Sequence, residues 1–304
     1  MKRLFYILFI SALVSVACSS KSETNEENNN QESTQQWQKY PEAGQLKIMS
    51  FNVRYGMAKE TNPMNNWEFR KAACVEMIRD HKPTLIGFQE AVYAVQWQFF
   101  LQEFADEYDG FGVGRDDGAE KGETMGIMYR KDEIRKLDEG TFWLSPTPDV
   151  CSKATEWGAG HFRTATWGIF EYIATGEKFF FMNTHLDVKS TRNHAMKLIA
   201  ERIKMYNPDN LPVYLAGDFN ADASDTIFNN ISNMLKNTRL YAPTERSDHG
   251  PTANSWTGES KSIIDHVYCS KNLTVYEYRT IRDPYDGVTY ISDHYPIYAI
   301  VSLH

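Results

Sequence analysis

Cysteine is scarce in this 304-residue sequence, and no segment is dense in lysine and arginine. Of the four cysteines, Cys74, Cys151 and Cys269 have spacings that match no zinc site. The formal net charge is −8, which argues against electrostatic binding of nucleic acid over a broad surface, because that affinity depends on clustered Lys and Arg. A local basic site is still compatible with this composition.

The N-terminus has the pattern of an export signal. Lys2 and Arg3 precede an apolar run over residues 4–17, which is too short to span a bilayer, so residues 1–17 are predicted to be a signal peptide. Cys18 follows where a bacterial lipoprotein is cleaved and lipidated, although Ser15 stands where Leu is usual. We expect a cell-envelope lipoprotein at the outer membrane or surface, in preference to a free secreted protein.

Residues 18–43 are expected to tether the folded protein to this lipid. The segment 19–38 is rich in Ser, Asn, Gln and Glu and too poor in apolar residues to bury a core, so it is predicted to be disordered. Residues 44–304 are then expected to form one domain, because about 260 residues fit a single α/β domain and neither a repeat nor a second linker interrupts them. We expect a monomer that contacts the membrane only through its lipid. With Cys18 lipidated, at most one disulfide can form.

Apolar periodicity predicts a mixture of strands and helices over residues 46–301. Strands are predicted at 46–52, 84–88, 124–129, 134–143, 164–173, 178–184, 213–216, 262–269, 274–280 and 295–301, and helices at 67–81, 94–108 and 193–206. The strands between 124 and 184 have the pattern of an antiparallel run joined by short turns. This mixture indicates an α/β fold with two mainly antiparallel sheets packed face to face and helices outside.

Polar side chains follow several of these predicted strands. Asp218 and Asn220, in Leu-Ala-Gly-Asp-Phe-Asn-Ala-Asp (215–222), suit a hard divalent cation, but the same pair could simply turn the chain. Glu90 also follows an apolar strand, where an ionised carboxylate needs a partner such as a metal. The groups at or beyond strand ends are Asn52, Glu90, His185, Asp218 with Asn220, Asp265, and Asp293 with His294. Catalytic residues gather at such positions because a rigid sheet fixes them.

The motifs that carry these groups resemble those of the endonuclease/exonuclease/phosphatase superfamily, which includes deoxyribonuclease I. They are Ser-Phe-Asn-Val-Arg (50–54), Gly-Phe-Gln-Glu (87–90), Asn-Thr-His-Leu-Asp (183–187), Gly-Asp-Phe-Asn-Ala (217–221), Ile-Asp-His-Val-Tyr (264–268) and Ser-Asp-His-Tyr-Pro (292–296). The resemblance covers nearly all of residues 46–303. It implies a DNase I-like four-layer α/β sandwich and Mg²⁺-dependent cleavage of phosphoester bonds, with Mn²⁺ or Ca²⁺ as further candidate cations.

The resemblance also implies a role for each oxygen ligand. Glu90 would be the principal metal ligand, with Asn52 and Asp293 beside it. Asp218 and Asn220 would flank the phosphate, either as a second cation site or as the pair that positions the attacking water. Mg²⁺ fits this set better than zinc, because the expected ligands are oxygens.

Proton transfer is assigned by the resemblance to two histidines. His294, oriented by Asp265, would act as general base, and His185 would protonate the leaving oxygen. Glu123, in Glu-Thr-Met-Gly-Ile-Met-Tyr-Arg, resembles the deoxyribonuclease glutamate that pairs with this second histidine. Hydrolysis of a phosphoester needs both transfers, because the attacking water loses a proton and the leaving group gains one.

Arg163, in Arg-Thr-Ala-Thr-Trp-Gly-Ile-Phe, resembles the phosphate-binding arginine of the superfamily. Asn52, Arg54 and Asn183 are further candidate phosphate contacts. Arg54 could instead pair with a nearby acid, and Asn183 could support the site from behind or be an ordinary polar group at a strand end. The same two alternatives are open for Asp187.

The sequence leaves the substrate class open. Single-stranded nucleic acid ends, nucleotides, small phosphodiesters, sugar or inositol phosphates and phospholipid head groups are all candidates. Val92 lies near the position where deoxyribonuclease I carries a groove-contacting arginine. Duplex DNA is therefore a less favoured candidate substrate. The alternative from another class is a protein that binds a phosphorylated ligand without turning it over.

Two further patterns have structural explanations. Ser247-Asp248-His249 repeats the Ser-Asp-His of residues 292–294, but Gly250 and Pro251 follow it, so we assign it to a surface turn. Trp157, between Glu156 and Gly158, is a candidate for an exposed loop contact.

Overall fold

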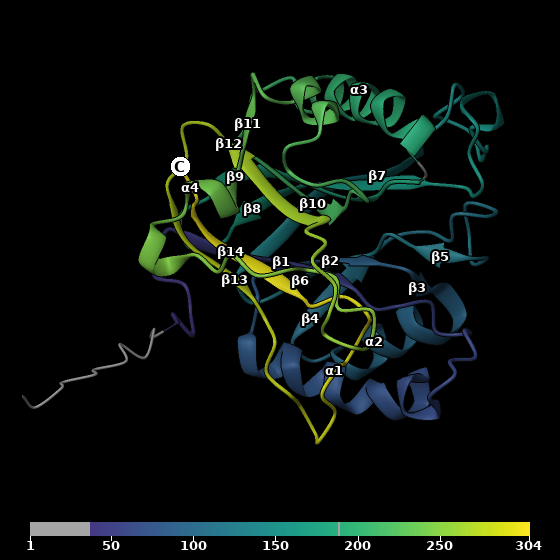
Figure 1. Ribbon diagram of the computed structural model, residues 1–304. Coiled ribbons are helices and arrows are strands. Elements are labelled where there is room, and N and C mark those ends of the chain that lie inside the picture. The colour runs from purple at the N-terminus through teal and green to yellow at the C-terminus, as the bar shows by residue number, and fades with distance from the viewer. Residues whose placement is uncertain (1–36, 188) are drawn as a thin grey trace, which may run out of the picture. The chain divides into compact units, whose positions relative to one another are not determined.

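The computed structural model describes residues 37–187 and 189–304, so the predicted signal peptide, Cys18 and most of the tether lie outside the described residues. Two six-stranded sheets lie face to face (Figure 1). The first has the order β13 (Val275–Thr280), β14 (Ile297–Ser302), β1 (Gln45–Asn52), β2 (Leu85–Gln89), β6 (Ile127–Arg130), β4 (Tyr108–Phe111). The second has the order β11 (Leu235–Asn237), β12 (Asp265–Ser270), β10 (Val213–Asp218), β9 (Glu177–His185), β8 (Thr164–Tyr172), β7 (Ile134–Trp143).

Helices cover the outer faces of both sheets (Figure 1). The helices are α1 (Trp67–His81), α2 (Gln98–Glu103), α3 (Lys189–Tyr206) and α4 (Thr238–Tyr241), and β3 (Ala91–Val92) pairs with β5 (Glu123–Thr124) in a small separate ladder. One apolar cluster lies between α1, α2 and the first sheet, a second between the sheets, and a third between α3 and the second sheet. These layers confirm the predicted four-layer α/β sandwich. No helix in the described ranges is long and apolar enough to cross a membrane.

Two parallel pairs of strands determine where the polar strand ends meet. β1 pairs in parallel with β2, which sets Asn52 opposite Gln89, and β9 pairs in parallel with β10, which sets His185 opposite Asp218. β12 runs antiparallel to β10, so its first residue, Asp265, is also opposite Asp218. Asp265 therefore begins a strand rather than ending one. The observed strand starts later in the chain than the predicted strand 262–269.

Two predictions about residues 94–130 were wrong. The helix predicted over 94–108 is a π-helical turn (Tyr93–Trp97) followed by α2, and the chain then enters β4. Phe104 and Tyr108 both pack into the same apolar cluster, which produces a helix-like spacing without a continuous helix. The strand predicted over 124–129 is not part of the antiparallel run with β7, β8 and β9, because β6 pairs with β2 and β4 in the first sheet.

Candidate active site

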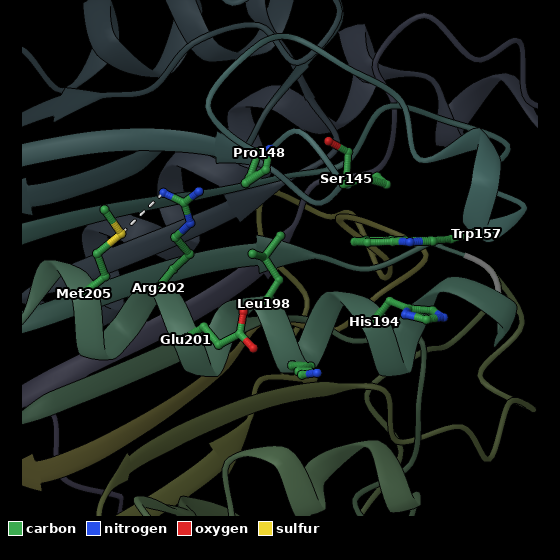
Figure 2. A pocket seen from close by; sticks show the side chains of 10 residues that line it. Ser145, Pro148, Trp157, His194, Leu198, Glu201, Arg202 and Met205 are labelled. Carbon is green, nitrogen blue, oxygen red and sulfur yellow. Dashed lines mark hydrogen bonds between the residues drawn. The ribbon is translucent and has the colours of Figure 1, made fainter.

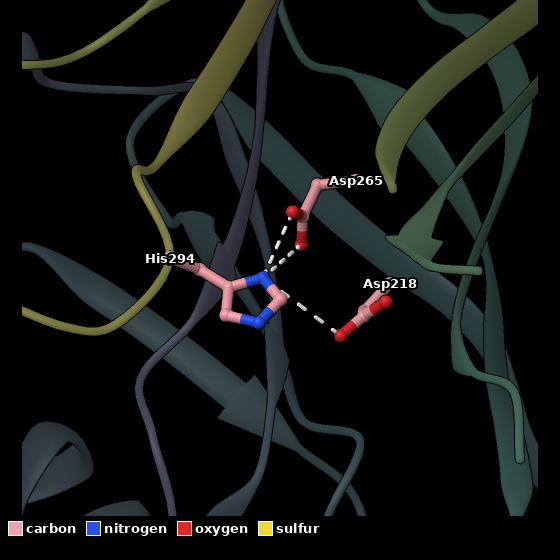
Figure 3. Close-up of side chains that lie close together, drawn as sticks. All are labelled: Asp218, Asp265 and His294. Atoms are coloured by element: carbon pink, nitrogen blue, oxygen red, sulfur yellow. Dashed lines mark hydrogen bonds and ion pairs between the residues drawn. The ribbon is translucent and has the colours of Figure 1, made fainter. Parts of the chain in front are cut away.

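The facing strand ends bring two histidine–carboxylate pairs together. His294 Nδ1 lies 2.9 Å from Asp265 Oδ2 and 3.9 Å from Asp218 Oδ2 (Figure 3). His185 Nε2 lies 3.4 Å from the same oxygen, Asp218 Oδ2. Asp218 is thus a buried carboxylate with two imidazoles near one of its oxygens, and Asp265 contacts one of those rings, as the family resemblance implies.

Asn52 connects the first sheet to this group. Its Nδ2 donates to Glu90 Oε1 at 3.1 Å and to Asp218 Oδ2 at 3.0 Å, so one amide bridges the ends of both sheets. Its Oδ1 accepts from the backbone N–H of Arg54 at 2.9 Å. The other oxygen of Glu90 accepts from the backbone N–H of Tyr55 at 2.8 Å. The predicted metal ligands of the first sheet are therefore held in place by hydrogen bonds.

The backbone at the site adopts left-handed conformations at three residues that are not glycine. The φ angles are 61° at Arg54, 60° at Glu90 and 48° at Asn220. Such conformations are costly for these residue types and persist where surrounding contacts hold them, commonly at functional sites. Each of the three residues immediately follows a strand or lies within two residues of one, so the turn that leaves each strand also aims a polar side chain.

Asn220 makes the contact of a turn residue and also contacts a histidine of the candidate site. Its backbone N–H donates to Asp218 Oδ1 at 2.9 Å, which is a local turn contact. Its Nδ2 lies 3.2 Å from His185 Nε2 and donates to Leu186 O at 3.0 Å. The amide thereby fixes the position of the His185 ring.

Arg163 is a buried cation with unused hydrogen-bond donors. Its Nε and Nη1 are buried and have no hydrogen-bond partner within the described residues. Its closest carboxylates are at ion-pair rather than hydrogen-bond distance, with Nη2 3.7 Å from Asp187 Oδ1 and Nη1 4.0 Å from Glu123 Oε2. A phosphate oxygen would satisfy these donors, so the geometry suits the predicted phosphate contact.

Glu123 differs from the prediction. In the structure it contacts two arginines rather than His185: Arg115 Nη1 donates to Glu123 Oε2 at 2.5 Å, and Arg163 lies beyond it. Glu123 begins β5, which pairs with the β3 strand that directly follows Glu90. This short ladder directs the Glu123 carboxylate toward the arginines. Glu123 therefore pairs with arginine side chains rather than with a histidine.

Arg54 and Asn183 also differ from the predicted phosphate contacts. Arg54 Nε donates to Glu60 at 2.8 Å and its Nη1 lies 3.4 Å from Asp293 Oδ2, which matches the structural alternative of pairing with an acid. The Asn183 amide donates to Phe88 O at 2.8 Å and to Gly126 O at 3.0 Å, while its Oδ1 accepts from Gln89. Asn183 is fully buried and joins the two sheets below the site.

Burial and neighbouring charges shift the pKa values of the two histidines in opposite directions. Burial lowers the pKa of His185 well below its usual value, and the nearby cations Arg163 and Arg115 lower it further, which favours the neutral form of this ring. Burial opposes a charge on His294 as well, but Asp265 and Asp218 outweigh it and hold the pKa of His294 well above its usual value. The neutral form of His294 becomes more accessible where the carboxylates around it are neutralised.

The carboxylates at the site repel one another. Burial raises the pKa of Asp218, and Asp265 and Glu90 raise it further. Burial and Glu90 also raise the pKa of Asp293. A cation would relieve this repulsion, and the donors are hard oxygens, so the residues present fit a divalent cation.

Two sets of side chains are candidates for holding that cation. Oxygen or nitrogen atoms of Asp218, Asp265 and His294 lie within 4.8 Å of one another. The last two already form a hydrogen-bonded pair, which a metal between them would break. The alternative set is Glu90 and Asp293, which the family resemblance implies as ligands, and Asn52 links Glu90 to Asp218.

A cavity of about 360 Å³ opens beside these groups, and sequence reasoning missed part of its wall. It is lined by Tyr55, Glu90, Arg115, Asp116, Gly122, Glu123, His161, Arg163 and His185. Arg115 and His161 were not predicted, because both lie in loops and have no strand-end motif. The only signal in the sequence was the charged segment Gly-Arg-Asp-Asp over residues 114–117.

The remaining patterns lie apart from this site. His249 is exposed in a loop, as predicted. Trp157 is half-buried and stacks on His194, with ring centroids 5.0 Å apart. Both rings border a separate hollow of about 480 Å³ along α3 (Figure 2), which contains none of the predicted site residues.

The buried amide of Asn183 yields a prediction about stability. The substitution Asn183→Ala removes the side-chain donor of Phe88 O, whereas Gly126 O keeps the backbone N–H of Phe88, so we expect a loss of about 1–3 kcal/mol in the free energy of unfolding. Urea denaturation followed by circular dichroism measures this loss. Asn229→Ala, at an exposed position, is the matched control. Equal stability of the two variants would contradict the structural role of Asn183.

Comparisons with known proteins agree with the fold. The model of the Endonuclease/Exonuclease/phosphatase family matches residues 49–294. The chain is similar to the mannosyl-6-phosphatase Bt3783 of Bacteroides thetaiotaomicron VPI-5482, at 32% identity and a TM-score of 0.78, covering 84% of this chain and 99% of the other.

A second structure from Bacteroides thetaiotaomicron, an endonuclease/exonuclease/phosphatase family protein, is 31% identical with a TM-score of 0.79, covering 86% of this chain and 95% of the other. The uncharacterized protein L388 of Acanthamoeba polyphaga mimivirus is 28% identical over 275 residues, which are 84% of this chain and 99% of that protein. The chain belongs to the Endonuclease/Exonuclease/phosphatase family, a family of phosphoester hydrolases.

Proposed function

We propose that the protein is a Mg²⁺-dependent phosphomonoesterase that acts on a sugar phosphate. The observation that carries the proposal is the arrangement around Asp218, which has two imidazoles beside it and is linked to Glu90 through Asn52. The unsatisfied guanidinium of Arg163 borders the same cavity as Glu90 and His185. These groups offer the three things that phosphoester hydrolysis needs, which are charge neutralisation, activation of water and protonation of the leaving oxygen.

In this proposal Glu90 and Asp293, with help from Asp218, would hold the cation, whose charge would neutralise that of the phosphoryl oxygens. Mn²⁺ or Ca²⁺ could replace Mg²⁺ at such oxygen ligands. Arg163 binds another phosphoryl oxygen through Nε and Nη1.

His294 accepts the proton of the attacking water through Nε2, because Asp265 holds its Nδ1. His185, kept in position by Asn220, gives a hydrogen bond or a proton to the leaving oxygen.

The proposed substrate class is supported by similarity and by charge. Bt3783, at 32% identity, is named a mannosyl-6-phosphatase, and the two chains match over 84% of this one. The net charge of −8 disfavours a long nucleic acid, whose binding needs many phosphate contacts. Phosphodiesters, inositol phosphates and phospholipid head groups are the alternatives that a substrate panel tests.

Removal of the cation or of His294 should abolish turnover. We expect EDTA to stop hydrolysis of p-nitrophenyl phosphate and excess Mg²⁺ to restore it. We expect His294→Ala to lower kcat by about 10²- to 10⁴-fold, which is the usual contribution of a positioned acid or base. His249→Ala, at the exposed Ser-Asp-His repeat, is the matched control and should retain wild-type activity.

Full activity in EDTA would contradict the metal assignment, and undiminished activity of His294→Ala would contradict the mechanism. A wild-type protein that binds phosphate esters but hydrolyses none on a broad panel would instead be a phospho-ligand-binding protein on this fold.

We also propose that the protein is exported and held at the cell envelope by a lipid on Cys18. Support comes from the sequence alone, through the basic pair Lys2-Arg3, the apolar run before Cys18 and the polar segment after it. Mass spectrometry of the protein purified from membranes should find an N-terminal acylated Cys18, and Cys18→Ser should move the protein to the soluble fraction. An intact N-terminus at Met1 in the mature protein would contradict export.

A further inference from the structure

The cavity beside Glu90, His185 and Arg163 has a second wall to which the proposed reaction assigns no role. This wall is lined by Tyr55, Arg115, Asp116, Gly122, Glu123 and His161. A substrate whose phosphate lies at Arg163 and whose leaving oxygen faces His185 would direct its leaving group toward this wall, because both residues border the same cavity. The wall is therefore in a position to recognise the leaving group.

The loop that carries Arg115 and Asp116 is firmly held. The backbone N–H of Arg115 donates to Glu123 O at 2.9 Å, and its carbonyl accepts from Trp143 Nε1 at 2.8 Å. The backbone N–H of Asp116 donates to Lys121 O at 3.0 Å. Gly122 has a φ of 85°, and a Cβ at this position would lie 2.5 Å from the Asp116 carboxylate. The wall is thus formed before a ligand binds, which lowers the entropic cost of binding.

The wall offers hydrogen-bond donors and acceptors in close alternation. The Arg115 guanidinium lies between two carboxylates, with Nη1 2.5 Å from Glu123 Oε2 and Nε 3.5 Å from Asp116 Oδ1. The Nε is buried and has no hydrogen-bond partner in the described part of the chain. Asp116 is about half exposed, so its carboxylate can reach a ligand. His161 adds a ring that both donates and accepts.

A leaving group that carries several hydroxyls matches this wall better than a nucleobase or an acyl chain does. Each hydroxyl both donates and accepts, so neighbouring hydroxyls of a sugar can donate to a carboxylate and accept from a guanidinium. A nucleobase is usually recognised by stacking on aromatic faces, and Tyr55 is the only phenylalanine, tyrosine or tryptophan among these lining residues. An acyl chain would need an apolar lining, which the three charged side chains of this wall, Arg115, Asp116 and Glu123, do not provide.

We infer that this wall is a subsite for a polyhydroxylated leaving group of monosaccharide size, in which Asp116 and Arg115 bind hydroxyls and select sugar phosphates over other phosphomonoesters. The inference rests on the proposed phosphomonoesterase function and adds the residues that determine its specificity. Glu123 acts as a positioning residue, because it holds Arg115 on one side and faces Arg163 on the other.

The test compares substrates rather than absolute rates. For wild type and for Asp116→Asn, kcat/KM is measured with glucose 6-phosphate, mannose 6-phosphate, adenosine 5′-monophosphate and p-nitrophenyl phosphate. We expect wild type to prefer the sugar phosphates, and Asp116→Asn to lower the ratio of sugar phosphate to p-nitrophenyl phosphate by about tenfold, as for a lost hydrogen bond to a charged group. Glu120→Gln, in the same loop but outside the cavity wall, is the control and should keep the wild-type ratio.

Damage to the fold would lower kcat/KM for all substrates together, so it cannot account for a lowered ratio. An unchanged ratio in Asp116→Asn, or a wild type that favours the nucleotide, would overturn the subsite while the proposed function stands. If wild type hydrolyses no phosphoester, the function fails separately, and calorimetry with mannose 6-phosphate decides the subsite. About tenfold weaker binding to Asp116→Asn than to wild type would support it, and equal affinity or no binding would overturn it.

Discussion

The hydrogen bonds of the Asn52 amide, one to Glu90 and one to Asp218, join the two sheets where their polar strand ends meet. Asn52 ends β1 in the first sheet and Asp218 ends β10 in the second, so no backbone ladder fixes one relative to the other. The amide supplies that link at the surface of the sandwich, and Asn183 supplies a second one below it. The distance between the expected cation ligands and the histidines depends on both.

This arrangement places several energetically unfavourable features in a small region. Neighbouring carboxylates raise the pKa of Asp218 and of Asp293. Arg163 is buried without a hydrogen-bond partner for two of its nitrogens among the described residues, and Glu90 has a left-handed backbone. Each feature costs stability in the free protein and is offset by the packed layers around it. A phosphate with a divalent cation would relieve both the repulsion and the unsatisfied guanidinium.

The sequence predicted the strand-end residues because their signals are local. An apolar run that stops at Asn52, Glu90 or Asp218 indicates a strand with a polar residue at its end, whichever sheet the strand joins. It did not predict that Asn183 faces the other sheet rather than the substrate, since this depends on which strands face each other. It also missed β4, because Phe104 and Tyr108 have the spacing of a helix.

The partners of Glu123 and the role of Arg115 could not be inferred for a related reason. Both depend on the pairing of β3 with β5 and on the course of the intervening loop, and neither has a periodic signal. The resemblance to a known family correctly selected Glu123 as a residue of the cavity, but the partner it implied was wrong. Family motifs thus located the site, while the contacts inside it required the structure.

Catalysis by this site as proposed requires a divalent cation at the carboxylates where the two sheets meet. Anomalous diffraction from crystals soaked in Mn²⁺ locates such a cation directly. We expect a peak at the oxygens of Glu90 and Asp293 on the Asp218 side, with the hydrogen bond between His294 and Asp265 intact. A peak between His294 and Asp265, or no peak near Glu90 at saturating Mn²⁺, would contradict this assignment.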